Sequence, residues 1–218
     1  LKSEFPNSVI LYNICGLAYR GLGKLDDAIS NFKLALSFKS NVPEIYSNMG
    51  LSLHEKNKLE DAIEAYKHAL AIKPNNAEAY NNMGNAFKDQ GKSKEAIEAY
   101  KKALVIKPDY ADAHYNLGYA LQDQGKLEEA IDAYKKAASI KPGYADIFSN
   151  LGVALKEKNK PEEAIEAFKK ALAIKPDYAE AYNNMGGVFN SQGKKRSAIA
   201  AFKKALAIKP DYAEAYNN

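Results

Sequence analysis

Residues 77–110 read AEAYNNMGNAFKDQGKSKEAIEAYKKALVIKPDY, and this stretch decides the fold because the chain repeats it with a period of 34 residues. Each copy carries a glycine, an alanine twelve residues later and, in five copies, a proline after another twelve residues. These residues are Gly16, Gly50, Gly84, Gly118, Gly152 and Gly186; Ala28, Ala62, Ala96, Ala130, Ala164 and Ala198; and Pro74, Pro108, Pro142, Pro176 and Pro210. Self-similarity at this period predicts a stack of equivalent supersecondary units in place of one central core.

Counting each copy from seven residues before its glycine gives six units, and positions are numbered 1 to 34 within each. The units are 9–42, 43–76, 77–110, 111–144, 145–178 and 179–212. Residues 1–8 are interpreted as the tail of a preceding element. Residues 213–218 repeat the AEAYNN of residues 77–82 and are interpreted as the start of a further, truncated repeat. We therefore expect a single array over residues 1–218, cut from a longer protein.

Each unit is predicted to hold two helices. In the third unit apolar or small residues recur at steps of three and four over residues 78–90, which is helical spacing. A second stripe of this kind ends at Lys107, before Pro108, which stops the helix. Position 15, between the helices, is always glycine or asparagine, residues that accept a left-handed backbone at low cost. We expect positive φ at the residues of this position: Gly23, Asn57, Gly91, Gly125, Asn159 and Gly193.

In the third unit Gly84 follows Tyr80 and Met83, and Phe87, Ala96, Tyr100, Ala103 and Pro108 come after it. This pattern resembles the tetratricopeptide repeat, and it covers all six units. The resemblance implies an all-α solenoid, a right-handed superhelix of tandem helix-turn-helix repeats with the first helices on its concave side. Pentatricopeptide repeats, which read RNA bases, are a weaker alternative, because their period is one residue longer and they lack this glycine and alanine spacing.

The composition limits the classes of function. The chain has 31 basic and 27 acidic residues, a net charge of +4, and this balance is not typical of nucleic-acid binding. No run of 18 apolar residues occurs, so no membrane-spanning helix is expected. The single cysteine, Cys15, takes the place of Met or Leu and is interpreted as a core residue of a protein in the reducing cytoplasm.

No catalytic constellation is visible, so we expect no enzyme activity, no cofactor and no metal site. The three histidines, His54, His68 and His114, fall at three different repeat positions and form no metal-binding pair. The glycines follow the repeat, and no phosphate-binding loop occurs. The acidic residues are spread regularly along the helices, as on a solvated face.

One row of residues does suggest a function. Position 6 is asparagine in five consecutive units, and the carboxamide offers both a donor and an acceptor to the main chain of an extended peptide. In the family this position faces the concave groove, and the row resembles the superhelical arm of O-linked N-acetylglucosamine transferases. The alternative is that asparagine is simply common at this position of the family. The predicted peptide-binding residues are this row (Asn48, Asn82, Asn116, Asn150 and Asn184), the acidic position 2 (Glu78, Asp112 and Asp146), Lys88 and Tyr119.

The groove does not carry the clamp with which some tetratricopeptide domains bind acidic chaperone tails. That clamp needs Lys, Asn, Asn, Lys and Arg at set positions of three adjacent units. One of the five matches, because the residues here are Asn13, Leu17, Asn48, Glu78 and Asn82.

Three hypotheses follow. The first is an interaction module that binds a partner protein or an extended, somewhat basic peptide along the concave face. The second is the substrate-recruiting arm of a larger enzyme, such as a protein O-glycosyltransferase. The third is a self-assembling scaffold that associates end to end, because the stripe around Ile199, Phe202 and Leu206 is expected to be partly uncovered.

Overall fold

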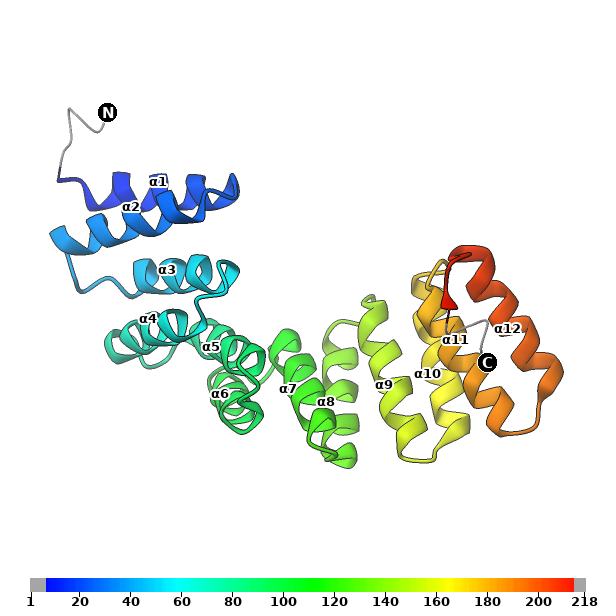
Figure 1. Cartoon of the computed structure of the whole chain (residues 1–218). Coiled ribbons are helices and arrows are strands. Elements are labelled where there is room, and N and C mark those ends of the chain that lie inside the picture. Colours follow the sequence, from blue (N-terminus) through cyan, green and yellow to red (C-terminus); the bar gives the residue numbers. More distant parts are fainter. Residues whose placement is uncertain (1–6, 214–218) are drawn as a thin grey trace. The chain divides into compact units, whose positions relative to one another are not determined.

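The computed structural model describes residues 7–213, which form twelve α-helices and no β-strand (Figure 1). The all-helical prediction is therefore confirmed. The helices are α1 (Val9–Gly21), α2 (Leu25–Phe38), α3 (Pro43–Glu55), α4 (Leu59–Ile72), α5 (Ala77–Asp89), α6 (Ser93–Ile106), α7 (Ala111–Asp123), α8 (Leu127–Ile140), α9 (Ala145–Glu157), α10 (Pro161–Ile174), α11 (Ala179–Ser191) and α12 (Lys195–Ile208). The thirteenth helical segment expected at residues 213–218 lies outside the described residues from 214 onward.

Contacts within the chain divide it into two compact units, residues 1–108 with α1–α6 and residues 109–218 with α7–α12. In each unit the two helices of a repeat form a hairpin, and the second helix packs against the first helix of the next repeat. Successive first helices also contact each other, as α1 with α3 and α7 with α9, whereas no two second helices are in comparable contact among the described residues. The first helices therefore form one layer of each unit, and their outer surface is called the groove face below.

The turn inside each repeat is set by position 15. The N–H of Gly91 donates to the Lys88 carbonyl at 2.8 Å, and the N–H of Lys92 donates to the Phe87 carbonyl at 2.9 Å. This pair of bonds is a Schellman motif, which needs a left-handed residue just after the helix. Positive φ is confirmed at all six residues, from 59° at the asparagines to 73° at Gly91. The helix ends at Asp89, so position 15 lies one residue beyond the C-cap, Gln90.

Close contact between the two helices of a repeat depends on the glycine at position 8. A Cβ atom on Gly84 would lie 2.5 Å from Cε1 of Tyr100, the fully buried ring at position 24 of the same repeat. Every repeat shows this contact of glycine with Phe or Tyr. The ring at position 24 therefore lies directly against the glycine of its own repeat.

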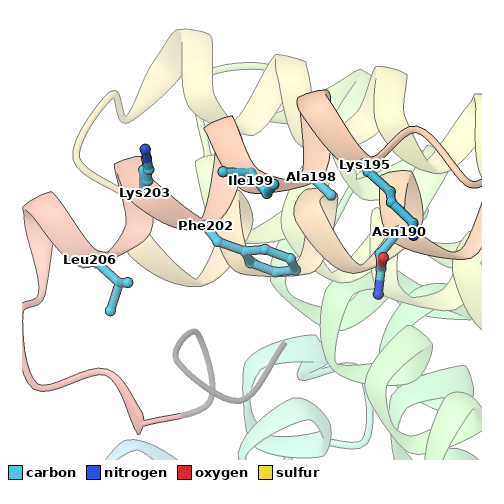
Figure 2. A pocket seen from close by; sticks show the side chains of 7 residues that line it. All are labelled: Asn190, Lys195, Ala198, Ile199, Phe202, Lys203 and Leu206. Atoms are coloured by element: carbon cyan, nitrogen blue, oxygen red, sulfur yellow. The ribbon is translucent and has the colours of Figure 1, made fainter.

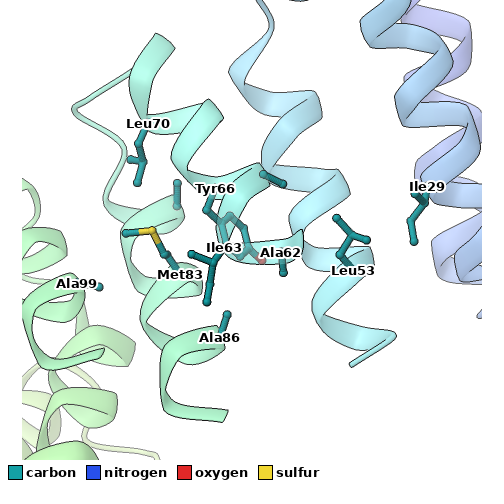
Figure 3. Packing of buried hydrophobic residues seen from close by; sticks show 11 residues of the cluster. Ile29, Leu53, Ala62, Ile63, Tyr66, Leu70, Met83, Ala86 and Ala99 are labelled. Carbon is teal, nitrogen blue, oxygen red and sulfur yellow. The ribbon is translucent and has the colours of Figure 1, made fainter. Parts of the chain in front are cut away.

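The core runs continuously from repeat to repeat, as Figure 3 shows for the first unit. One cluster joins Ile29 of α2, Leu53 of α3, Tyr66 of α4 and Met83 of α5. These helices come from three successive repeats, so the cluster does not belong to a single repeat. Burial therefore depends on having a neighbour on both sides. No described helix combines the length and the apolar character that crossing a bilayer requires.

Candidate functional site

The asparagine row lies on successive first helices, on the groove face of each unit. Asn48 and Asn82 belong to the first unit, and the row Asn116, Asn150 and Asn184 belongs to the second; all five side chains are half-buried. The side-chain N–H of Asn48 donates to Asn13 Oδ1 at 3.3 Å, and that of Asn150 donates to the Tyr115 hydroxyl at 2.8 Å. These bonds fix the amides and turn their donors toward the preceding repeat.

The acidic row at position 2 is partly neutralised, which the sequence did not predict. The ammonium group of Lys141 lies 2.7 Å from Asp112, and Lys73 lies 3.5 Å from Glu44, the equivalent residue of the second repeat. These lysines stand at position 31 of the same repeat, a spacing of 29 residues that is not a helical neighbour spacing. Glu78 is exposed and carries no such partner among the described residues.

Asp146 makes a different contact. It accepts a hydrogen bond from the Tyr178 hydroxyl at 2.7 Å. Burial, and then the bond to this carboxylate, raise the pKa of Tyr178 above its usual range, so the hydroxyl remains a donor at neutral pH. The recorded partner of Asp146 is therefore a neutral hydroxyl, whereas that of Asp112 is the ammonium group of Lys141.

A ladder of polar pairs joins position 12 of one repeat to position 13 of the next. Arg20 donates to Glu55 at 2.6 Å and His54 contacts Asp89 at 2.7 Å, whereas the pair in the second unit is Gln122 with Glu157 at 2.9 Å. Of the residues at position 12, the sequence predicted only Lys88 as a site residue, and the acidic partners at position 13 were missed. The signal was present as complementary residues 35 apart in three places.

Lys88, another predicted site residue, is half-buried at position 12 of the third repeat. Its ammonium group lies 3.4 Å from a carboxylate oxygen of the adjacent Asp89. This lysine therefore lies beside Asp89, the ladder partner of His54, and its charge is partly balanced there.

Tyr119 lines a cavity of about 300 Å³ between α7 and α9, and its side chain is 51% exposed. The other residues of this cavity, called the Tyr119 pocket below, are Gln122, Asp123, Asn150, Val153 and Glu157. The structure thus brings Tyr119 and Asn150, both predicted from the sequence, to one site. Gln122 and Glu157 were not among the predicted site residues.

The groove face of the first repeat is apolar. Ile10, Ile14 and Leu17 take positions 2, 6 and 9, where the following repeats carry acidic, amide or mixed residues, and they are 73%, 56% and 41% exposed. No three His, Cys, Asp or Glu side chains in the described residues are arranged to hold a metal ion. The groove face therefore offers hydrogen bonds, carboxylates and aromatic rings, which are groups suited to recognition.

Comparison with known proteins agrees with this geometry. The TPR repeat pattern matches residues 16–56, 50–91 and 84–125, and tetratricopeptide repeat patterns match residues 109–177 and 149–213. No curated protein matches the chain in sequence. Among solved structures, MamA is 34% identical over 76% of this chain and 97% of its own, with a TM-score of 0.72.

Two other structures extend the comparison. YrrB, described as a TPR protein with an unusual peptide-binding site, is 25% identical over 85% of this chain and 96% of its own, with a TM-score of 0.75. PilW, a type IV pilus biogenesis factor, shares the fold at 20% identity, over 96% of this chain and 97% of its own, with a TM-score of 0.82. The family patterns cover nearly all of the repeats, and the chain belongs to the tetratricopeptide repeat family.

Proposed function

We propose that the chain is a protein-binding module that holds an extended segment of a partner against its groove face. The observation that carries the proposal is asparagine at position 6 in five consecutive repeats, half-buried on the first helices. Asn150 lines a cavity with its donor already bound to Tyr115, so its carbonyl oxygen can accept a hydrogen bond from a peptide N–H. A neighbour in structure, YrrB, is itself described as having a peptide-binding site.

Each hydrogen bond between an asparagine and the main chain of the peptide contributes little binding free energy, and the contributions add up along the row. One hydrogen bond exchanged with water contributes about 0.5–1.5 kcal/mol net. Several bonds are therefore needed to exceed the cost of ordering a peptide and reach roughly micromolar affinity. Asp146 and Glu78 add carboxylates to the groove face without a lysine partner of the kind that Asp112 has among the described residues, so the preferred extended segment is somewhat basic.

The test is the double substitution Asn116→Ala with Asn150→Ala. An extended peptide is first selected from a displayed peptide library for binding to the wild-type chain, and its Kd is then measured for the wild type and the variant. We expect the Kd to rise by roughly five- to a hundredfold, which corresponds to two lost bonds. The matched control is Lys136→Ala with Lys169→Ala, two exposed residues of the second helices α8 and α10. Unchanged binding by the asparagine variant, with an intact helical spectrum, would move the site away from the row.

A second candidate function is end-to-end self-association, favoured by the surface of α12. Ile199 is 55% exposed, whereas the equivalent Ile165 is 8% exposed beneath the next repeat. Ile199, Phe202 and Leu206 line a cavity of about 340 Å³ on this surface. Figure 2 shows the side chains of the lining residues. Light scattering over a concentration series tests this candidate: association that Ile199→Lys abolishes supports it, and a strict monomer at high concentration contradicts it.

The substrate-recruiting arm of a protein-modifying enzyme is a special case of the first proposal. The groove face would then bind a segment that a separate catalytic region modifies. The sequence of the complete protein distinguishes this case, because it either contains a catalytic domain or does not.

A further inference from the structure

The Tyr119 pocket is lined in part by residues that are specific to its repeats, unlike a second cavity of the same unit. A cavity of about 120 Å³ between α8, α9 and α10 recurs at the same repeat positions in the first unit, so it reflects the architecture of the repeat. The Tyr119 pocket depends on an aromatic residue at position 9, where the other repeats carry Leu17, Leu51, Asn85, Val153 or Gly187. Its volume of about 300 Å³ is at the lower end for ligand sites and suits one large side chain.

The charge of this pocket follows from one break in the polar ladder. Glu55 and Asp89, which are equivalent to Glu157, contact Arg20 and His54. Glu157 instead accepts a hydrogen bond from Gln122, a neutral amide, and forms no ion pair within the described part of the chain. The amide orients the Glu157 carboxylate without cancelling its charge. Asp123 also lines the pocket.

The carboxamides of Gln122 and Asn150 also line the pocket. The ring of Tyr134 is fully buried, and its hydroxyl donates to Gln122 Oε1 at 3.1 Å. The oxygen of the Gln122 amide is therefore bonded to Tyr134, and its nitrogen is bonded to Glu157. Asn150 donates one N–H to the Tyr115 hydroxyl, and its carbonyl oxygen is an acceptor on the pocket. A pocket with the Glu157 carboxylate, the Asn150 carbonyl oxygen and a half-exposed aromatic ring favours a planar cation with several donors.

We propose that the Tyr119 pocket binds the guanidinium group of an arginine side chain from the partner segment. The guanidinium stacks on the Tyr119 ring and donates to Glu157 and to the Asn150 carbonyl oxygen. This inference rests on the proposed function and deepens it, because it assigns one anchoring side chain to a segment that the asparagines hold by its main chain. An anion would be repelled by the Glu157 carboxylate, and an apolar side chain would leave the charge of Glu157 without a partner.

The experiment uses the whole chain with labelled valine methyl groups and a small probe. The chain has five valines, and Val153 lines the pocket, so its methyl signals report binding there. The probe is N-acetyl-arginine N-methylamide, compared with the citrulline derivative, which has the same shape without the charge, and with the lysine derivative. We expect the arginine derivative to shift the Val153 signals and to bind at least about fivefold more tightly than either comparison compound.

Three variants define the pocket. Glu157→Gln and Tyr119→Leu are each expected to weaken the arginine derivative about fivefold or more, and leucine already stands at the equivalent position as Leu17 and Leu51. Glu55→Gln is the matched control, because Glu55 already contacts Arg20. It is expected to leave the Val153 titration unchanged.

Equal binding of the arginine and citrulline derivatives would overturn the inference, and so would equal binding of the lysine derivative or an unchanged affinity in Glu157→Gln. The outcome is separate from that of the proposed function. If the selected peptide loses affinity in the asparagine variant but tolerates replacement of its arginines, the groove binds the segment and the pocket assignment fails. If the arginine probe binds at Val153 while the asparagine variant binds the peptide normally, the pocket stands without the main-chain row.

Discussion

Gly186 and Gly187 are neighbours in α11 with opposite surroundings. A Cβ atom on Gly186 would lie 2.6 Å from Cε1 of Phe202, whereas one on Gly187 would meet nothing within 4 Å. Gly186→Ala is therefore expected to destabilise the protein by about 1–3 kcal/mol through overpacking. Gly187→Ala is expected to stabilise it by roughly 0.5–1 kcal/mol, because alanine is the better residue inside a helix. Urea unfolding of both variants checks the sign, and equal shifts would contradict the role of the Phe202 contact.

The three tyrosines at position 24 allow a second test at the scale of one atom. The Tyr100 hydroxyl donates to Asn85 Oδ1 at 2.8 Å, but the equivalent Tyr66 hydroxyl is buried without a hydrogen-bond partner, because position 9 of its repeat is Leu51. Tyr66→Phe is expected to be neutral or to stabilise the protein by up to about 1–2 kcal/mol. Tyr100→Phe is expected to cost about 0.5–1.5 kcal/mol. If Tyr66→Phe were the more damaging change in thermal unfolding, this account of the two hydroxyls would be wrong.

At the scale of the element, the turn within a repeat depends on one left-handed residue. Gly91 has a φ of 73°, and a Cβ atom there is strained even though the space around it is open. Gly91→Ala is expected to lower the free energy of unfolding by about 1 kcal/mol. The control is Gly21→Ala, at the last residue of α1, where φ is not positive and the space is also open. A urea midpoint that both variants leave unchanged would show that the Schellman turn tolerates a side chain.

The helices could be predicted from the sequence because their signals are local and six-fold repeated. Position 15 is an example, since glycine and asparagine share one backbone property that needs no knowledge of the neighbours. The site was predicted less completely. The rotamer of Asn150 depends on Tyr115, and the charge of Asp112 is balanced by Lys141, which is 29 residues away. Those contacts depend on how repeats pack, and a single sequence gives no register for side chains on different helices.

At the scale of the whole molecule, a linear array should be least stable where a repeat lacks a neighbour. The chain contains its own control, because residues 167–173 and 201–207 have the same sequence, AFKKALA. The first copy lies in α10, which packs against α11, and the second lies in α12, where Ile199 is 55% exposed. Amide protons of the second copy are therefore expected to exchange at least about tenfold faster, which corresponds to a local opening free energy lower by roughly 1.4 kcal/mol.

Nuclear magnetic resonance is the suitable measurement, because short peptides from the two copies have equal masses. Mass spectrometry can distinguish them if each peptide includes the preceding first turn, which is PEE at residues 161–163 and KRS at residues 195–197. Intrinsic exchange rates are equal for equal sequences, so a difference within AFKKALA reports the neighbours alone. Equal protection of the two copies would mean that α12 is as well covered as α10 in solution, by self-association or by further chain. Repeating the measurement at a tenfold lower protein concentration separates these two cases, since only self-association depends on concentration.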